Sequence, residues 1–364
     1  LAHLFDQMIE CGVEETIVIV GYRKEMIMGY FGGEYEGMRI VYHEQKEQLG
    51  TLHALHQVKH LLNGRFYVLY GDDLLHADDL KKCLDHQYAI SLMRTSTPER
   101  FGIAVIEDDK VVNIVEKPAE FIGDLASVGG FMFDMKVFDY PLEKDEGEKE
   151  FYIPNMLRKL AKDAGIKPIM IEKYWLPTGY CWNLLNANEV MMKELEGPDI
   201  KGEVEEGVTI KGNAVIGEGT VVKAGSYLEG NVVIGDNCVI GPNAYLQDGT
   251  VIGNNCKVGH HVSVKNSIFM DGARAGHLTY VGDSILGENV NLGAGTIVAN
   301  LRHDGKNVFS MHDGKLVDTG RRKFGVVLAD GVKTGIKTMF YPGRKMWPGT
   351  MTFPGESVSK DIMD

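Results

Sequence analysis

One stretch decides the fold: residues 210–264 read IKGNAVIGEGTVVKAGSYLEGNVVIGDNCVIGPNAYLQDGTVIGNNCKVGHHVSV. Every sixth residue from Ile210 to Val264 is aliphatic, and Gly or Pro follows several of them. The apolar stripe of a helix recurs at 3.6 residues and that of a strand at 2, so neither explains the pattern. A period of six predicts a solenoid of parallel strands that turns a corner every six residues and points one branched side chain inward per face. Gly and Asn supply the corners, where positive φ is often needed.

The length of the repeat favours the solenoid over a Gly-rich loop region or an ordinary β-sandwich. Burying the ten aliphatic side chains contributes about 15–30 kcal/mol, an upper bound because the unfolded chain is partly collapsed. The run resembles the hexapeptide repeat of left-handed parallel β-helices. The period stutters after Met270, and we expect chemistry at the two breaks, 265–280 and 299–325. Two further phases follow, at Tyr280, Leu286, Leu292 and Val298, and then at Leu328, Thr334, Phe340, Met346 and Thr352.

Composition bounds the class of protein. A chain of 364 residues predicts two domains, and the net charge of −13 argues against nonspecific nucleic-acid binding. No apolar run approaches the length that a membrane span needs, so we expect no membrane association. Five cysteines stand singly, which predicts reduced thiols in a cytoplasmic protein. The chain opens with Leu1 rather than Met, so we expect its natural start to lie upstream.

Residues 1–198 alternate between strand and helix patterns, which predicts a Rossmann-like α/β domain with a mostly parallel sheet and helices on both faces. Gly197-Pro198 marks the boundary before a β-helix domain at 199–364. We expect helices at 1–11, 25–31, 51–62, 154–164 and 183–196. We expect strands at 15–20, 38–42, 66–70, 88–93, 103–107, 111–116, 126–134 and 167–172.

Four short stretches in this half carry chemistry. In Gln45–Thr51 (QKEQLGT), two amides can read the polar edge of a base, and Gly-Thr lets backbone approach a flat ring. Asp72 follows an apolar strand, where a carboxylate could help a divalent ion bridge phosphates. Ile114–Pro118 (IVEKP) offers an acid for sugar hydroxyls and an ammonium for phosphate, and Val128–Gly130 offers bare backbone beside a sugar. Singly, Gly-Asp-Asp is more often a turn and Glu-Lys a solvated pair.

In this order the four stretches resemble the sugar-1-phosphate nucleotidyltransferases, which join UTP or dTTP to a sugar-1-phosphate and release pyrophosphate. The resemblance implies that the base is met by Gln45, Gln48, Gly50 and Thr51, that Mg²⁺ is held by Asp72, and that the sugar is met by Gly102, Glu116, Lys117 and Gly130.

Two departures from this family pattern bear on nucleotidyl transfer. The family opens with a Gly-rich loop of the type G-x-G-T-R followed by P-K, whereas this chain starts inside the following helix. The family also carries an acid in a W-x-D-x-G pattern, where this chain has Pro177. Positioning and charge neutralisation supply nearly all of phosphoryl-transfer catalysis, so we predict little nucleotidyl transfer by this chain.

The first break contains Ala275–Asp283 (AGHLTYVGD), and the next coil contains Gly287–Thr296 (GENVNLGAGT). Together with the first half, these stretches resemble the bifunctional enzymes that make UDP-N-acetylglucosamine. The β-helix of those enzymes acetylates glucosamine-1-phosphate from acetyl-CoA. Asn300–Asp304 (NLRHD) and Thr319–Lys323 (TGRRK) are similar to the archaeal branch of this family.

The acetyl transfer requires an amine to attack a thioester and lose a proton. Histidine, with an unperturbed pKa of about 6.5, can accept that proton, and we assign the base to His277. The alternative is that His277 is a corner residue with a satisfied ring. Tyr280 and Asn291 can orient the amino sugar, Lys265 can pair with its phosphate, and Ala294 and Asn300 line the acetyl-CoA side. Relatives carry charged residues where this chain has Gln247, Ser263 and Phe309.

Three matters stay open from the sequence. The insertion 301–324 is either a hairpin arm for CoA phosphates or a neighbouring subunit, or a solvated charged hairpin. The family resemblance implies a homotrimer with active sites between subunits. The alternatives to UDP-N-acetylglucosamine synthesis are a glucose-1-phosphate thymidylyltransferase-like enzyme, which Val128 favours, an acetyltransferase whose first domain is not catalytic, and a non-enzymatic assembly subunit.

Overall fold

The computed structural model describes residues 1–363. The chain divides into two compact units, Leu1–Thr178 and Gly179–Asp364. This division falls ahead of the boundary expected at residue 198, and it groups helix α6 (Asn183–Met191) with the solenoid. Within the described residues, no helix is both long enough and apolar enough to span a membrane.

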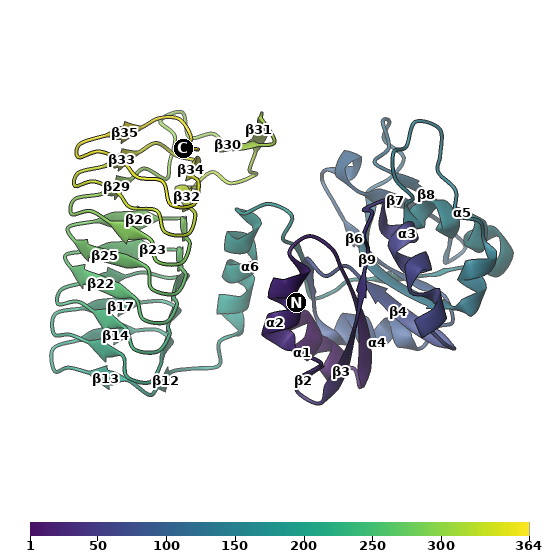
Figure 1. Ribbon diagram of the computed structural model, residues 1–364, viewed down its shortest axis with the longest axis horizontal. Helices are drawn as coiled ribbons and strands as arrows, with labels where there is room; N and C mark the ends of the chain where they lie inside the picture. The colour runs from purple at the N-terminus through teal and green to yellow at the C-terminus, as the bar shows by residue number, and fades with distance from the viewer. Residues whose placement is uncertain (364) are drawn as a thin grey trace. The chain divides into compact units, whose positions relative to one another are not determined.

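The first unit is an α/β fold with three sheets (Figure 1). Its helices are α1 (Ala2–Glu10), α2 (Lys24–Phe31), α3 (Thr51–Gln57), α4 (Ala77–Leu84) and α5 (Ile153–Ala164), with 3-10 turns at Lys59–Leu61, Pro98–Arg100 and Met135–Asp139. One sheet has the order β1 (Glu15–Val20), β3 (Met38–Glu44) and β2 (Glu34–Tyr35). The six-stranded sheet contains β10 (Lys167–Met170), β6 (Ala89–Arg94), β9 (Leu125–Asp134), β7 (Gly102–Glu107), β8 (Lys110–Glu116) and β4 (Arg65–Leu69). The third sheet pairs β5 (Asp73–Leu75) with β11 (Trp175–Pro177).

The expectation of a mostly parallel sheet is wrong for the six-stranded sheet. Only β10 and β6 pair in parallel there, because β9 runs antiparallel to its partners β4, β6 and β7. Strands β7 and β8 form a hairpin whose turn residues Asp108 and Asp109 have φ of 47° and 60°. Two residues at positive φ make the tight turn that matches the twist of an antiparallel pair. A hairpin connection needs no crossover helix, so this half of the sheet departs from strand–helix alternation.

The second unit is a parallel β-solenoid built on three sheets, with helix α6 alongside it (Figure 1). The first sheet stacks β12 (Asp199–Ile200), β15 (Ala214–Ile216), β18 (Val232–Ile234), β21 (Thr250–Ile252), β24 (Ile268–Phe269), β27 (Ile285–Leu286), β32 (Val326–Leu328) and β34 (Arg344–Met346). The second stacks β13 (Glu203–Val204), β16 (Val221–Val222), β19 (Val239–Ile240), β22 (Lys257–His260), β25 (Arg274–His277) and β28 (Asn291–Leu292). The third stacks β14 (Thr209–Lys211), β17 (Tyr227–Glu229), β20 (Tyr245–Leu246), β23 (Ser263–Lys265), β26 (Tyr280–Gly282), β29 (Ile297–Val298), β33 (Met339–Phe340) and β35 (Ser357–Val358).

The six-residue period predicted the interior of this solenoid. The aliphatic positions from Ile216 to Val264 are at most 1% exposed and form one continuous core. The later positions Leu328, Phe340 and Met346 join the same core. Asn237, Asn243 and Asn255 occupy corners at φ of 55° to 57°, as expected for residues that tolerate the left-handed region. The solenoid has three parallel sheets, one inward residue per face and corners at positive φ. These features are consistent with the predicted left-handed β-helix.

The predicted position of the stutter is wrong. The inward residue after Val264 is Phe269, and the one after Val281 is Leu286, so each of two corners lacks one residue. The first shortened corner therefore lies before Met270 rather than after it. The inward residue of strand β26 is Val281, which is fully buried, whereas Tyr280 lies outside the core and is half-buried. Pairing across these coils is consequently offset by 17 residues instead of 18.

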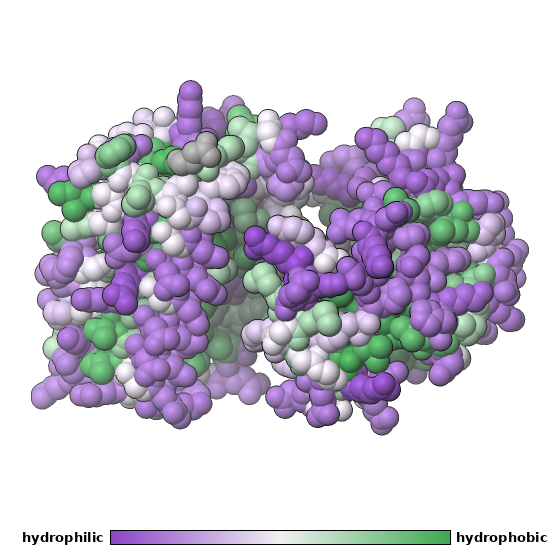
Figure 2. All heavy atoms as spheres, viewed as in Figure 1, coloured by the Kyte–Doolittle hydropathy of each residue, from purple (hydrophilic) through white to green (hydrophobic). Residues whose placement is uncertain are grey.

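Helix α6 and the insertion pack together on the solenoid. Trp182 and Leu185 from the start of α6 lie in one buried cluster with Ile285, Val308 and Phe324. The insertion forms the predicted hairpin, with strands β30 (Phe309–His312) and β31 (Lys315–Asp318). A short 3-10 turn, Met192–Glu194, follows α6. Figure 2 shows that the visible face of the solenoid is mainly hydrophilic, with separate apolar patches.

Candidate active sites

The predicted base-binding stretch forms the turn before α3. Gln45 donates from Nε2 to the backbone oxygen of Gly50 at 3.4 Å and lies 3.0 Å from Nδ1 of His53. Thr51 begins α3, and its hydroxyl accepts a hydrogen bond from the amide of Ile153 at 3.2 Å. Gln48 lies beside Gly21, because a Cβ added at Gly21 would come within 3.1 Å of its Nε2 atom. The two contacts of Gln45 hold its amide at the start of the helix, whereas the Gln48 amide lies next to the end of strand β1.

Gly50 is required here by packing. Its φ is 103°, a value that side chains rarely allow, and an added Cβ would lie 2.5 Å from the carbonyl oxygen of Phe151. The chain on either side is bound to the same segment, because Phe151 donates to Leu49 and Leu52 donates back to Phe151. A glycine therefore lets the turn lie directly on residue 151.

Tyr70 lies close to all four of the predicted stretches, although the sequence analysis did not select it. Its hydroxyl shares a hydrogen bond with Thr51, and its ring fills the space where a Cβ of Gly129 would lie. Burial raises the pKa of Tyr70 well above its usual range, and the nearby carboxylates of Glu116 and Asp72 act in the same direction. Thr51, Glu116 and Asp72 are therefore gathered around one aromatic side chain.

The predicted metal ligand lies at the end of strand β4. Asp72 is exposed, and its backbone oxygen accepts hydrogen bonds from both the amide and the hydroxyl of Thr178. The neighbouring Asp73 is only 6% exposed, and burial raises its pKa to about 7, with the charge of Asp72 acting in the same direction. Pro177, which stands where the family pattern has its second acid, lies opposite Asp73 in the β5–β11 pair. At this position the chain therefore contributes to a small sheet and offers no side-chain ligand for a metal.

A single carboxylate is enough to fit magnesium here. Within residues 1–363, no cluster of three or more His, Cys, Asp or Glu side chains could hold a metal by itself. Mg²⁺ is usually bound by one or two carboxylates together with substrate phosphates and water. The exposed carboxylate of Asp72 matches that requirement, and any remaining ligands would come from the substrate.

The predicted sugar-binding residues meet in the six-stranded sheet. Gly102 and Glu116 are paired in register across the β7–β8 hairpin. Burial raises the pKa of Glu116, while Lys117, whose Nζ lies 3.7 Å from the Glu116 carboxylate, acts in the opposite direction. Gly130 pairs with Leu69 of β4, and an added Cβ there would lie 2.7 Å from the hydroxyl of Ser91. These positions leave the strand backbone bare beside a partly buried carboxyl group.

The predicted base of the second unit, His277, ends strand β25 and is exposed. Its Nδ1 atom lies 2.9 Å from Nδ1 of His260, which ends strand β22 on the preceding coil. The ring centroids of His260 and His277 are 4.6 Å apart, and the ring of His261 packs edge-on against His260 at a centroid distance of 5.6 Å. The sequence analysis missed His260, because its pairing with His277 follows only from the 17-residue coil.

Tyr280 and Asn300, two of the predicted substrate residues, contact each other through their side chains. Asn300 donates from Nδ2 to the Tyr280 hydroxyl at 3.4 Å and to Oδ2 of Asp283 at 2.6 Å. Burial raises the pKa of Tyr280, and the charge of Asp283 adds to this shift. Asp283 is 3% exposed and adopts φ of 50°, so its carboxylate serves as a fixed anchor within the fold.

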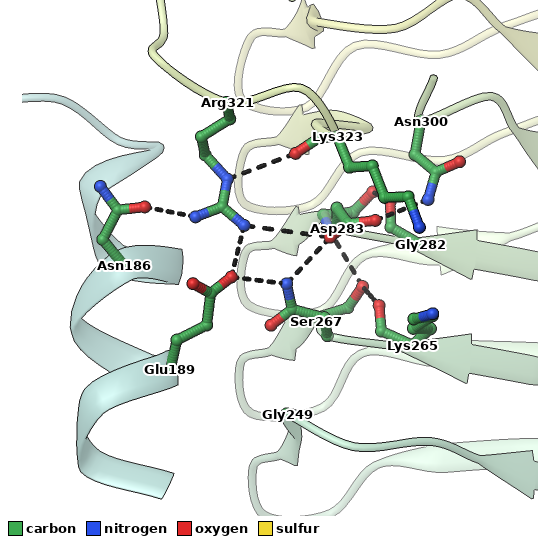
Figure 3. Close-up of polar contacts among 12 residues, drawn as sticks. Asn186, Glu189, Gly249, Lys265, Ser267, Gly282, Asp283, Asn300, Arg321 and Lys323 are labelled. Carbon is green, nitrogen blue, oxygen red and sulfur yellow. Dashed lines mark hydrogen bonds and ion pairs between the residues drawn. The ribbon is translucent and has the colours of Figure 1, made fainter. Parts of the chain in front are cut away.

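A single arginine connects this anchor to helix α6 (Figure 3). Arg321 donates to Glu189 at 2.6 Å and to Asn186, and its guanidinium lies 3.9 Å from Oδ1 of Asp283. Asn266 bridges the same two acids, since its Nδ2 atom donates to Glu189 at 2.8 Å and to Asp283 at 2.9 Å. The sequence analysis placed Arg321 in the charged insertion and in its Thr319–Lys323 stretch. It did not identify these partners, because they come from distant parts of the chain.

The remaining predicted residues lie on neighbouring strands of the same coils. Lys265 pairs with Gly282 across β23 and β26, and its backbone oxygen accepts from the Asp283 amide at 2.9 Å. Asn291 is exposed on β28, in register with Arg274. Ala294 accepts a backbone hydrogen bond from Lys337 at 2.8 Å. At the three departures, Gln247 donates to Ser263 at 3.2 Å, and the backbone oxygen of Phe309 accepts from Arg344.

Comparison with protein families matches both halves of the chain. The nucleotidyl transferase family matches residues 1–194, which is more than half of the chain. A family described as the GMPPB C-terminal domain matches residues 228–340, within the solenoid.

Curated relatives match along the whole chain. The bifunctional protein GlmU of Methanocaldococcus jannaschii is 38% identical over 369 residues, which cover 100% of this chain and 88% of that protein. A protein of the same name from Methanococcus maripaludis strain C7 is 40% identical over 370 residues and covers 100% and 87%. The bifunctional sugar-1-phosphate nucleotidylyltransferase/acetyltransferase of Sulfurisphaera tokodaii is 33% identical over 371 residues and covers 100% and 90%.

Proposed function

The chain belongs to the family of bifunctional sugar-1-phosphate nucleotidyltransferase/acetyltransferases, and we propose that its two units make UDP-N-acetylglucosamine in two successive transfers. The solenoid transfers the acetyl group of acetyl-CoA to glucosamine-1-phosphate. The α/β unit then joins the product to the uridylyl group of UTP and releases pyrophosphate.

The exposed imidazole of His277 carries the proposal for acetyl transfer. The amine of the sugar attacks the thioester carbonyl, and Nε2 of His277 accepts the amine proton as the C–N bond forms. The carbonyl carbon then releases the CoA thiolate, which takes up the proton. Lys265 pairs with the sugar phosphate, and Tyr280 and Asn291 orient the hexose. Ala294 and Asn300 line the acetyl-CoA side, where the Asp283 contact fixes the Asn300 amide.

In the α/β unit, the turn before α3 supplies the nucleotide contacts. Gln45 and Gln48 read the polar edge of the base, while Gly50 and Thr51 bring backbone close to its face. Gly102, Glu116, Lys117 and Gly130 bind the sugar phosphate. Asp72 would hold Mg²⁺, which neutralises phosphate charge when bound. Because Pro177 stands where the family pattern has a second acid, we predict that uridylyl transfer is the weaker of the two activities.

Assembly and location are part of the proposal. Exposed apolar side chains near His277, including Leu278 and Ile297, support a homotrimer whose solenoids share their active sites. All five cysteines of the described chain are free thiols, which supports a reducing, cytoplasmic location.

Release of free CoA is the decisive assay. The protein is incubated with acetyl-CoA and glucosamine-1-phosphate, with galactosamine-1-phosphate in a parallel reaction to establish the hexose. His277→Ala should lower turnover by about 10²–10⁴-fold while leaving the thermal unfolding midpoint unchanged. Unchanged turnover in this variant would refute the role of His277.

Pyrophosphate release with UTP and with dTTP separates uridylyl transfer from the thymidylyl alternative.

A further inference from the structure

Two imidazoles from consecutive coils of the solenoid meet nitrogen to nitrogen. His260 and His277 are register partners of strands β22 and β25, and their Nδ1 atoms are 2.9 Å apart. The His277 backbone is held independently, because its carbonyl oxygen accepts from the hydroxyl of Thr279 at 2.8 Å and from the amide of Gly295 at 3.2 Å. The contact with His260 therefore concerns the orientation and proton of the His277 ring, not the course of the chain.

The contact restricts where the proton of His277 can lie. Two neutral imidazoles can share this hydrogen bond only if one Nδ1 atom carries a hydrogen and the other presents a lone pair. If His277 accepts, its own hydrogen must be on Nε2, and that nitrogen cannot act as a base. If His277 donates, its Nε2 atom presents a lone pair to solvent or substrate. Within the described residues, no hydrogen bond occupies Nε2 of His277.

We propose that His260 is a positioning residue for acetyl transfer, which accepts the Nδ1 hydrogen of His277 and so keeps the Nε2 lone pair free for the amine proton. This inference rests on the acetyltransferase activity proposed above. When Nε2 takes the proton, His277 becomes an imidazolium, and its Nδ1 hydrogen bond to neutral His260 becomes charge-assisted and stronger. A contact that strengthens as the amine loses its proton favours the transition state over the ground state.

His260 is the side chain that holds the Nδ1 atom of His277 by a hydrogen bond in this chain. Ser263 stands where relatives carry a charged residue, and its hydroxyl accepts a hydrogen bond from Gln247 at 3.2 Å. Among the described residues, its side chain makes no hydrogen bond with His277. His261 is not part of this hydrogen bond, because its ring packs at 89° against His260 and contributes no hydrogen bond to the pair. His261 therefore provides a matched control on the adjacent position.

The test combines the tautomer of His277 with steady-state kinetics in three variants. His260→Leu removes the acceptor, and His260→Asn keeps one, because the amide Oδ1 is placed as the imidazole Nδ1 is. His261→Asn is the control, since Asn tolerates the φ of 54° at that position. The ¹⁵N chemical shifts of the His277 ring are read in histidine-labelled full-length protein without substrate, with His277→Asn to assign the signals.

We expect the Nδ1–H form of neutral His277 in the wild type, in His260→Asn and in His261→Asn, and a shift to the Nε2–H form in His260→Leu. The kcat for acetyl transfer should fall about 10–100-fold in His260→Leu with little change in KM for the sugar, and should stay within about threefold in the other two variants. A wild-type His277 with its hydrogen on Nε2, or a His260→Leu variant with unchanged tautomer and kcat, would overturn the inference. If the wild type transfers no acetyl group while the tautomer still depends on His260, the pairing stands and the proposed function fails.

Discussion

Arg321 and Glu189 are 132 residues apart in sequence, and a 2.6 Å hydrogen bond between them joins the end of the hairpin insertion to helix α6. The same guanidinium lies 3.9 Å from the buried carboxylate of Asp283, which in turn holds the amide of Asn300. The helix after the first unit and the charged insertion are thus both part of the support of the candidate acetyl-CoA site (Figure 3).

Arg321→Met should destabilise the second unit. The change leaves Asp283 without its nearest cation, although two asparagine amides continue to satisfy the carboxylate. We expect a loss of about 1–3 kcal/mol, less than for a fully isolated buried charge. Thermal unfolding followed by tryptophan fluorescence can report it, since Trp182 packs near Phe324. Arg322→Met is the matched control, because Arg322 is exposed, and equal effects of the two changes would contradict a specific role for Arg321.

The sequence predicted the solenoid better than it predicted the site. Inward residues such as Ile216 and Val264 depend only on a period of six, so they could be read directly. Two corners that lack one residue reduce the offset between paired residues of consecutive coils from 18 to 17. As a result Val281, and not the expected Tyr280, points into the interior. The partnership of His260 with His277 depends on that offset, so it could not be found before the register was known.

The first unit shows the same limit in another form. Its longer strands and most of its helices lie close to the expected ranges, because local patterns set them. Helix α4 and the short strands β2, β5 and β11 were not predicted. The direction of β9 is a long-range property, and the sequence patterns that predict strands carry no direct information about it. Tyr70 was likewise read as the end of an apolar strand, whereas its contacts with Thr51 and Gly129 come from two other segments.

Gly50→Ala should destabilise the first unit even without nucleotide. The added Cβ would lie 2.5 Å from the carbonyl oxygen of Phe151, and φ of 103° would strain any side chain. We expect a loss of about 1–3 kcal/mol in chemical denaturation. Gly33→Ala is the control, because it has no atom within 4 Å of the new Cβ and lacks the strained φ. If Gly50→Ala is as stable as the control, the requirement at residue 50 comes from nucleotide binding and not from the fold.

Glu116→Gln should change how stability depends on pH. Burial raises the folded-state pKa of Glu116, so the folded protein binds more protons than the unfolded protein above the unfolded-state pKa of about 4.3. The contribution of Glu116 to stability is therefore fully present below that pKa and is lost as pH rises toward the folded-state value. The variant should gain stability relative to wild type as pH rises above about 4, as measured by the unfolding midpoint. A difference that stays constant over this range would show that Glu116 ionises as freely in the fold as in water.

Leu278→Asn tests whether the solenoids associate around His277. Leu278 is 58% exposed in one subunit and has φ of 50°, a conformation that costs a non-glycine residue about 1–2 kcal/mol and that asparagine tolerates. The fold of a single subunit should thus be kept or stabilised, while a trimer that buries Leu278 should weaken. Sedimentation at decreasing protein concentration should show that the variant dissociates at a higher protein concentration than wild type, together with loss of CoA release.

Ile200→Thr, on the first coil, is the control. It removes another exposed apolar side chain and should leave the assembly unchanged. A wild type that sediments as a monomer, or a Leu278→Asn trimer as stable and active as wild type, would contradict an active site shared between subunits at this corner.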